Sequence, residues 1–379
     1  MDQFPICCRV WFSIFNRYSL IRRKAPILLV ALSGSFCLAC HGEPLVIAIA
    51  GDGRAEYLWN PHRPCDEKGI NKWVTTAIAK AVAKDNASIL LWTGDIVNVN
   101  GPEDGSLLGD GIDNWRDAMK SLYANKVKVW PVRGNHEVYR YLSKDNYDGV
   151  PIENSPTIWK QKFPELPQNE PKSDDGLSFY WTQASVLIVG LDEYGGANSN
   201  PLQRQHTVNQ TWLDQVLQQN KKSLTFVYGH EAAFMAGHHT DDDTLAADAK
   251  ARNSFLQSLI AAKAIYFCGH DHFYDRMGIV RSSAPPGSKI FQITAGTAGA
   301  PFYPAGQYAG SAVWKEDRSA HFDNVYGYIL IKVDGDKAVI TFKGALPSAF
   351  SEQGEVTFTP MDQIVCDSTG CNMIFCEGN

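Results

Sequence analysis

The stretch LVIAIAGDGRAEY, Leu45 to Tyr57, holds the pattern that decides the fold of this 379-residue chain. An apolar run with the length of a buried strand ends abruptly at Gly51-Asp52, and Arg54 follows two residues later. A glycine lets the backbone leave a strand sharply, so the next side chain can point into the space beyond the sheet. A carboxylate at this place is a candidate metal ligand or catalytic group.

The same arrangement occurs four more times along the chain. Apolar runs at 88–92, 127–132, 224–228 and 264–268 lead to Gly94-Asp95, Gly134-Asn135-His136-Glu137, Gly229-His230 and Gly269-His270-Asp271-His272, respectively. A single Gly-Asp is commonly a turn, and a single His-x-His is often a structural pair. Five such motifs at the same place on their strands indicate one shared site, because chemistry in α/β sheets collects beyond the carboxyl ends of strands.

The rest of the chain alternates between apolar strands and amphipathic helices, which predicts an α/β fold built on a largely parallel sheet. Further strands are expected at 45–50, 185–191, 290–294, 327–333 and 337–343, and helices at 71–84, 114–125, 210–220 and 246–262. Residues 98–113 and 139–176 lack such patterns and are expected to be loops that border the site and set its specificity. No linker divides residues 43–360, so we expect one domain followed by a Cys-rich tail, 361–379.

Composition narrows the class of protein. The chain is 44% hydrophobic and 11% aromatic, which is ample for a large core. Its net charge of −6 argues against a nucleic-acid surface, which needs clustered Lys and Arg. A small anionic substrate remains compatible with this charge, since a metal or one arginine can supply local positive charge. No obligate protein partner is indicated.

Residues 1–42 resemble a secretory signal segment, because five basic residues precede an apolar run at 27–40 that is followed by small residues. The run is shorter than the roughly 18–20 residues that span a bilayer. We therefore expect export to a periplasm or secretion. An uncleaved anchor and lipidation at Cys40 are the alternatives, and they offer the one expected contact with a membrane.

Five cysteines follow the signal segment: Cys65, Cys268, Cys366, Cys371 and Cys376. An exported compartment permits disulfides, and three of these cysteines lie close together near the C-terminus. Cys268 stands in an apolar strand and is expected to be a free buried thiol. The pairing among the other four stays open.

The side chains of the five motifs offer six metal donors without a thiol: Asp52, Asp95, Asn135, His230, His270 and His272. Oxygen and imidazole donors suit divalent ions such as Zn, Mn, Fe or Ni. Six ligands are many for one catalytic ion that must keep an open position. They fit two ions that share a carboxylate, an arrangement used to attack phosphate esters.

In this order the five motifs resemble those of the calcineurin-like metallophosphoesterases. YGHEAAF (228–234), GHDHFYDR (269–276) and TAGTAGAPFY (294–303) are similar to the purple-acid-phosphatase-like branch. The resemblance covers Leu45 to Lys343. It implies a four-layer α/β/β/α sandwich of two mixed sheets flanked by helices, and a hydrolase of phosphoric esters.

The resemblance also implies roles for single residues. Asp95 would bridge two divalent ions, Asp52 and His272 would hold the first, and Asn135, His230 and His270 would hold the second. A hydroxide between the metals would attack the phosphorus of a small phosphomonoester or phosphodiester. His136 would assist the leaving group. Glu137 and Asp271 could orient the imidazoles of the histidine ligands or could be ordinary loop carboxylates.

Two positions depart from the family pattern. Many relatives have a histidine ligand where this chain has Arg54, and the purple-acid branch has a tyrosine where this chain has Asn98. Arg54 could bind substrate phosphate, pair with a carboxylate such as Glu56, or discourage the first ion. The last role gives a competing hypothesis, a non-catalytic or weakly active phosphate-compound-binding protein. Residues 238–243, although rich in His and Asp, are expected to form a solvated rim.

Overall fold

A computed structural model describes residues 44–56, 66–99, 106–141, 149–170, 174, 176–195, 205–235, 237–283, 289–304, 313–352 and 354–376. The chain divides into two units, Met1–Gly42 and Glu43–Asn379. The expected signal segment and Cys65 lie outside the described residues. Within the described part of the chain, no helix is long and apolar enough to cross a membrane.

The first large sheet has seven strands in the order β18-β17-β16-β15-β1-β4-β5. It is mixed: β1, β4 and β5 are parallel, whereas β15 pairs antiparallel with β1, and the remaining pairs are antiparallel. Its strands are β1 (Leu45–Ala50), β4 (Ile89–Trp92), β5 (Lys128–Pro131), β15 (Tyr326–Asp334), β16 (Lys337–Ala345), β17 (Thr359–Asp367) and β18 (Gly370–Cys376).

The second large sheet also has seven strands, in the order β14-β12-β13-β11-β10-β9-β8. Strands β9, β10, β11 and β13 are parallel, and β8, β12 and β14 are antiparallel to their neighbours. Its strands are β8 (Phe179–Gln183), β9 (Val186–Gly190), β10 (Leu224–Tyr228), β11 (Ile265–Cys268), β12 (Tyr274–Arg281), β13 (Ile290–Ala295) and β14 (Trp314–Phe322). The prediction of a largely parallel sheet from the alternating pattern is therefore wrong. The two mixed sheets implied by the family resemblance are confirmed.

Alternate residues of the second sheet enter two different cores. On β10, Phe226 and Tyr228 pack with residues of the first sheet, whereas Val227 packs with α6 and α7. The same alternation holds on β9 and β11. Because both faces are buried, these strands read as continuous apolar runs. Each fully buried Val, Leu, Ile or Phe side chain stabilises the fold by about 1.5–3 kcal/mol.

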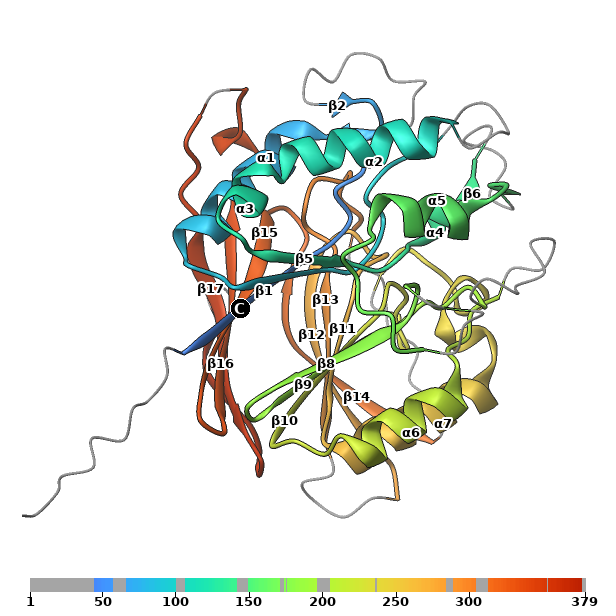
Figure 1. Ribbon diagram of the computed structural model, residues 1–379. Coiled ribbons are helices and arrows are strands. Elements are labelled where there is room, and N and C mark those ends of the chain that lie inside the picture. The colour runs from blue at the N-terminus through green and yellow to red at the C-terminus, as the bar shows by residue number, and fades with distance from the viewer. Residues whose placement is uncertain are drawn as a thin grey trace, which may run out of the picture. The chain divides into compact units, whose positions relative to one another are not determined.

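Helices cover the outer faces of the two sheets and complete the sandwich. Figure 1 shows α1, α2 and α3 together along one sheet and α6 and α7 together along the other. The helices are α1 (Lys72–Lys84), α2 (Ser106–Ala118), α3 (Lys120–Ala124), α4 (Asn135–Val138), α5 (Ser155–Lys162), α6 (Gln210–Gln219) and α7 (Ala249–Ala262). Asn71, Asn209 and Asp248 cap α1, α6 and α7 by accepting backbone N–H groups, which explains where these helices begin.

The two segments expected to be loops contain regular structure. The helix expected at 114–125 begins at Ser106, and a break after Ala118 divides it into α2 and α3. The segment 139–176 contains α5 and a two-stranded pair, β6 (Tyr139–Arg140) with β7 (Val150–Pro151). Another short pair joins β2 (Asp66–Glu67) to β3 (Ile70–Asn71). Tertiary packing of Leu108, Ile112 and Trp115 stabilises α2 despite its glycines and aspartates.

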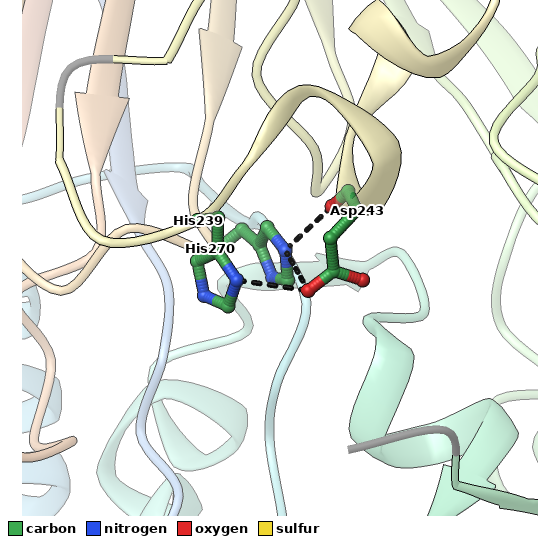
Figure 2. Close-up of side chains that lie close together, drawn as sticks. All are labelled: His239, Asp243 and His270. Carbon is green, nitrogen blue, oxygen red and sulfur yellow. Dashed lines mark hydrogen bonds and ion pairs between the residues drawn. The ribbon is translucent and has the colours of Figure 1, made fainter.

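A 3-10 turn, Asp241–Asp243, brings Asp243 beside the end of β11, where it contacts His239 and His270 (Figure 2).

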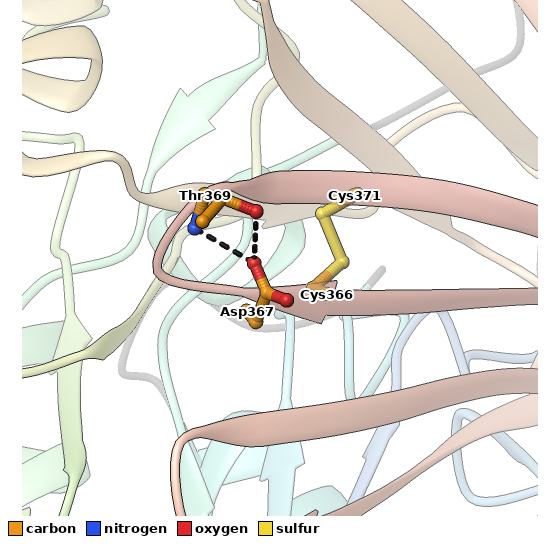
Figure 3. The surroundings of a disulfide bond; sticks show 4 residues. All are labelled: Cys366, Asp367, Thr369 and Cys371. Carbon is orange, nitrogen blue, oxygen red and sulfur yellow. Dashed lines mark hydrogen bonds between the residues drawn. A yellow bond between two sulfur atoms is a disulfide. The ribbon is translucent and has the colours of Figure 1, made fainter.

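Near the C-terminus, the segment expected as a tail adds β17 and β18 to the first sheet. Cys366 and Cys371 form a disulfide that closes this hairpin (Figure 3). Cys268 is a free buried thiol, as expected.

Candidate metal centre

All six residues expected to bind metal follow the carboxyl ends of strands that run parallel within their sheets. They are buried, with at most 5% of the residue exposed. The structure places them as follows: Asp52 after β1, Asp95 after β4, Asn135 after β5, His230 after β10, and His270 and His272 after β11. Both sheets therefore contribute to one centre.

Three of these residues have backbone conformations that are uncommon outside glycine. Asp52, Asp95 and His270 have φ angles of 61°, 50° and 69°. Residues held in this left-handed region cost about 1–3 kcal/mol each and cluster at functional sites. At Gly269, a Cβ atom would lie 2.2 Å from Asp52 Oδ2, so the motif needs glycine for the close approach of its backbone to the Asp52 side chain. The strained backbone supports a functional role for this edge of the sheets.

The family resemblance implies two ion positions that share Asp95. The second position is the space among Asp95, Asn135, His230 and His270. His230 Nε2 lies 3.0 Å from Asn135 Oδ1, 3.1 Å from His270 Nδ1 and 3.4 Å from Asp95 Oδ1. Atoms that share one ion at about 2.1 Å lie roughly 3 to 3.4 Å from one another. Asn135 Nδ2 donates to Tyr141 Oη at 2.6 Å, which turns the amide oxygen toward the imidazoles. The three distances from His230 Nε2 are those of atoms that share an ion.

The tautomers of the two imidazoles at the second position support the same conclusion. His230 Nδ1 donates to Thr93 O at 2.7 Å, and His270 Nε2 donates to Asp243 O at 3.0 Å. A neutral imidazole has one N–H and one lone pair, so the nitrogens that face each other both carry lone pairs. Burial, followed by the charge of His239, holds the pKa of His270 well below its usual value. Two imidazole lone pairs beside an amide oxygen and a carboxylate form a donor set that suits a metal ion.

The first position is formed by Asp52, Asp95 and His272, whose ligand atoms all lie within 4.8 Å of one another. His272 Nδ1 donates to Pro301 O at 2.6 Å, so its Nε2 also carries an inward lone pair. Asp52 Oδ1 lies 3.6 Å from that nitrogen. Burial, followed by the neighbouring Asp95, raises the pKa of Asp52 well above its usual value.

Arg54 enters this first position. Its Nη2 lies 3.3 Å from His272 Nε2, and its Nε donates to Asp95 Oδ2 at 3.2 Å. The guanidinium also donates to Tyr303 Oη and Ala55 O, each at 3.2 Å. Of the roles left open for Arg54, pairing with a carboxylate is observed, and the carboxylate is Asp95. Burial and then the charge of Arg54 lower the pKa of His272 well below its usual value.

Two buried glutamates hold the motif backbones in place. Glu137 accepts from the backbone N–H groups of Gly134, Asp95 and Val97 at 2.7, 3.0 and 3.1 Å. Burial, followed by Asp95, raises the pKa of Glu137 to about 8. Glu193, which the sequence patterns did not indicate, accepts from the N–H groups of His230 and Glu231 at 2.8 and 2.6 Å. Glu137 therefore holds the backbones of two motifs, whereas its expected role in orienting imidazoles stays a prediction.

The segment 238–243 borders the cavity and is largely exposed, as expected of a solvated rim, but two of its side chains, His239 and Asp243, reach inward to His270. Figure 2 shows His239 stacked on His270, with ring centroids 3.5 Å apart, and both rings directed toward Asp243. His239 Nδ1 donates to Asp243 Oδ2 at 2.9 Å. Burial lowers the pKa of His239, but the hydrogen bond to Asp243 and nearby carboxylates outweigh it, and the net direction is upward. Asp271 Oδ1 accepts from the backbone N–H groups of His238 and His239 and so anchors this segment.

A cavity of about 270 Å³ opens above both positions. His136 lines it, with Nε2 3.9 Å from Asp95 Oδ2. Burial, followed by the charge of Arg54, lowers the pKa of His136 well below its usual value. Asn98 lies outside this lining, and its Nδ2 donates to Ala55 O at 3.5 Å. The lining comprises Arg54, Asp95, Asn135, His136, Tyr141, His238, His239, Thr240, Asp242, Asp243, His270, His272 and Tyr303.

Comparison with known proteins identifies the family and supports the fold. The sequence model of the calcineurin-like phosphoesterase family matches residues 62–274. A search of curated proteins found no match. Among solved structures, the fold is similar to that of PhoD, with a TM-score of 0.57 and 11% identity over 89% of this chain and 73% of that one. It is also similar to purple acid phosphatase PPD1 from yellow lupin (Lupinus luteus) seeds, with a TM-score of 0.52 and 12% identity over 89% of this chain and 57% of that one.

Proposed function

The chain belongs to the calcineurin-like phosphoesterase family, and we propose that this metal-dependent hydrolase is exported and cleaves a small phosphomonoester or phosphodiester in the cavity above its metal centre. The observation that carries the proposal is the second position. There His230 Nε2 faces two other uncharged acceptor atoms, Asn135 Oδ1 at 3.0 Å and His270 Nδ1 at 3.1 Å. Such an arrangement is stabilised by a bound cation.

The expected divalent ions are of the Zn, Mn, Fe or Ni type, and one at the second position is the minimum requirement. A bound metal lowers the pKa of a coordinated water from about 15.7 to about 7 and so supplies a nucleophile near neutral pH. The protein's own part is to fix the donors. Backbone carbonyls set the tautomers of the three histidines, and Asn135 is oriented by Tyr141.

Two histidines on the cavity wall are placed to act on the leaving group. His136 is expected to be neutral, because its pKa is lowered, and it can donate a hydrogen bond to the leaving oxygen. His239 has a raised pKa and is paired with Asp243, so it is the better source of a proton near neutral pH. A positioned acid of this kind contributes about 10²- to 10⁴-fold to the rate. Arg54 adds positive charge to the wall of the cavity on which the phosphate would bind.

A second candidate function is binding of a phosphate compound with little or no turnover. The contacts of Arg54 with Asp95 and His272 favour it, because they occupy groups that a first ion would use. The two functions differ in hydrolysis, and also in how strongly they depend on metal.

The test is hydrolysis of p-nitrophenyl phosphate and bis-p-nitrophenyl phosphate by the purified chain. We expect turnover of at least one ester, loss of it after dialysis against a chelator, and recovery on addition of Zn, Mn, Fe or Ni. Phosphate binding without hydrolysis under every metal would contradict the enzyme and support the binding protein.

A further inference from the structure

The guanidinium of Arg54 lies against donors that a first metal ion would use. It contacts two of the three residues of the first position, Asp95 and His272, at 3.2 and 3.3 Å. Only 2% of Arg54 is exposed. Its planar group is therefore fixed inside the centre, between the carboxylate that both positions share and the histidine of the first position.

The single lone pair of His272 makes the two occupants mutually exclusive. His272 Nδ1 carries the proton that is donated to Pro301 O, so Nε2 has the one remaining lone pair. Arg54 Nη2 meets Nε2 at 3.3 Å, whereas an ion such as zinc would lie about 2.0–2.1 Å from it in the same direction. The nitrogen can accept from Arg54 or bind an ion, but it cannot do both.

The rest of the guanidinium is held by further acceptors. Ala55 O and Tyr303 Oη each accept at 3.2 Å, and Tyr303 stacks on His272 with ring centroids 3.9 Å apart. An arginine side chain stays charged at all ordinary pH values. If the guanidinium moved away, its buried charge would lose these acceptors. If it stayed in place, it would repel a divalent ion bound beside it.

We propose that Arg54 takes the place of the first metal ion, so that the folded protein binds one divalent ion, through Asp95, Asn135, His230 and His270. The phosphate group of the substrate then binds between that ion and the fixed charge of Arg54. The proposal rests on the proposed metal-dependent hydrolysis and names the cations of that site.

The test counts metal ions per chain by elemental analysis and calorimetry after removal of metal and titration with Mn²⁺. Wild type should bind one ion and give the electron-paramagnetic-resonance spectrum of an isolated Mn²⁺. Arg54→Ala should bind a second ion and give a spectrum of two coupled ions, whereas Arg54→Lys, which keeps the charge, should still bind one. Arg318→Ala is a matched control, because Arg318 also pairs with a buried carboxylate, that of Asp275, on a different part of the second sheet.

Two ions in wild type, or one ion in a folded Arg54→Ala, would overturn the proposal. If Arg54→Ala does not fold, the count and spectrum of wild type decide the matter alone. Hydrolysis measured on the same samples separates the two proposals. One ion without turnover contradicts the proposed function and leaves the metal count standing, whereas two ions with turnover do the reverse.

Discussion

The two ion positions lie on the two sides of Asp95. They differ in the group that faces their histidine lone pairs. At the second position His230 and His270 direct lone pairs at each other across 3.1 Å. At the first position the lone pair of His272 is met by Arg54. The comparison teaches that a histidine at the end of a parallel strand can leave its lone pair available to a metal ion or can use it to accept a hydrogen bond from the protein itself.

Removal of an imidazole from the second position should have the largest effect. His230→Ala should abolish tight metal binding and lower hydrolysis by more than the 10- to 100-fold that loss of an orienting neighbour typically costs. The measurement is metal content with kcat/KM. His321→Ala is the control, since His321 pairs with Asp275 and not with the centre. Full metal content in a folded His230→Ala protein would contradict the assigned position.

The equivalent change at the first position should spare the ion. His272→Ala removes an acceptor of Arg54 but no ligand of the second position, so metal content should stay at the wild-type value. Hydrolysis should fall by about 10²-fold, because the cation beside the phosphate loses its fixed orientation. Comparing the metal content of the His230→Ala and His272→Ala proteins measures the asymmetry directly. Equal loss of metal from both would mean that both positions hold ions.

The smallest effect is expected from a change at a residue that acts on the second position through another residue. Tyr266 Oη donates to Glu193, which in turn accepts the N–H of His230. Tyr266→Phe should lower the free energy of unfolding by about 1–3 kcal/mol and weaken metal binding by less than the ligand changes do. Unfolding by urea and metal titration measure the two effects.

The control for this change is Tyr274→Phe, because Tyr274 donates to Asp362. It should lose comparable stability with no change in metal affinity. If the two variants weaken metal binding equally, Glu193 does not transmit an effect from Tyr266 to His230.

Much of the fold could be predicted because strand periodicity and strand-end glycines are local features. The strands that carry the motifs were found within one or two residues, and the family resemblance supplied the mixed sheets. The N-terminal part of α2 was missed because its glycines and aspartates hide an apolar face, formed by Leu108 and Ile112, that is buried only in the folded chain. Strands β12, β14, β17 and β18 were missed because polar residues interrupt their apolar runs, and pairing in the sheet decides whether such segments become strands.

The sequence by itself determined which donors enter the centre and in what order, from Asp52 to His272. It could do so because each donor directly follows a strand, and strands that run parallel carry such residues to one edge of a sheet. Only the tertiary structure decided which way each donor's lone pair points. The carbonyls of Thr93, Asp243 and Pro301 fix the histidine tautomers across gaps of up to 137 residues. The tertiary structure also decided the partner of Arg54, because residues far apart in the sequence supply the acceptors that this long side chain reaches.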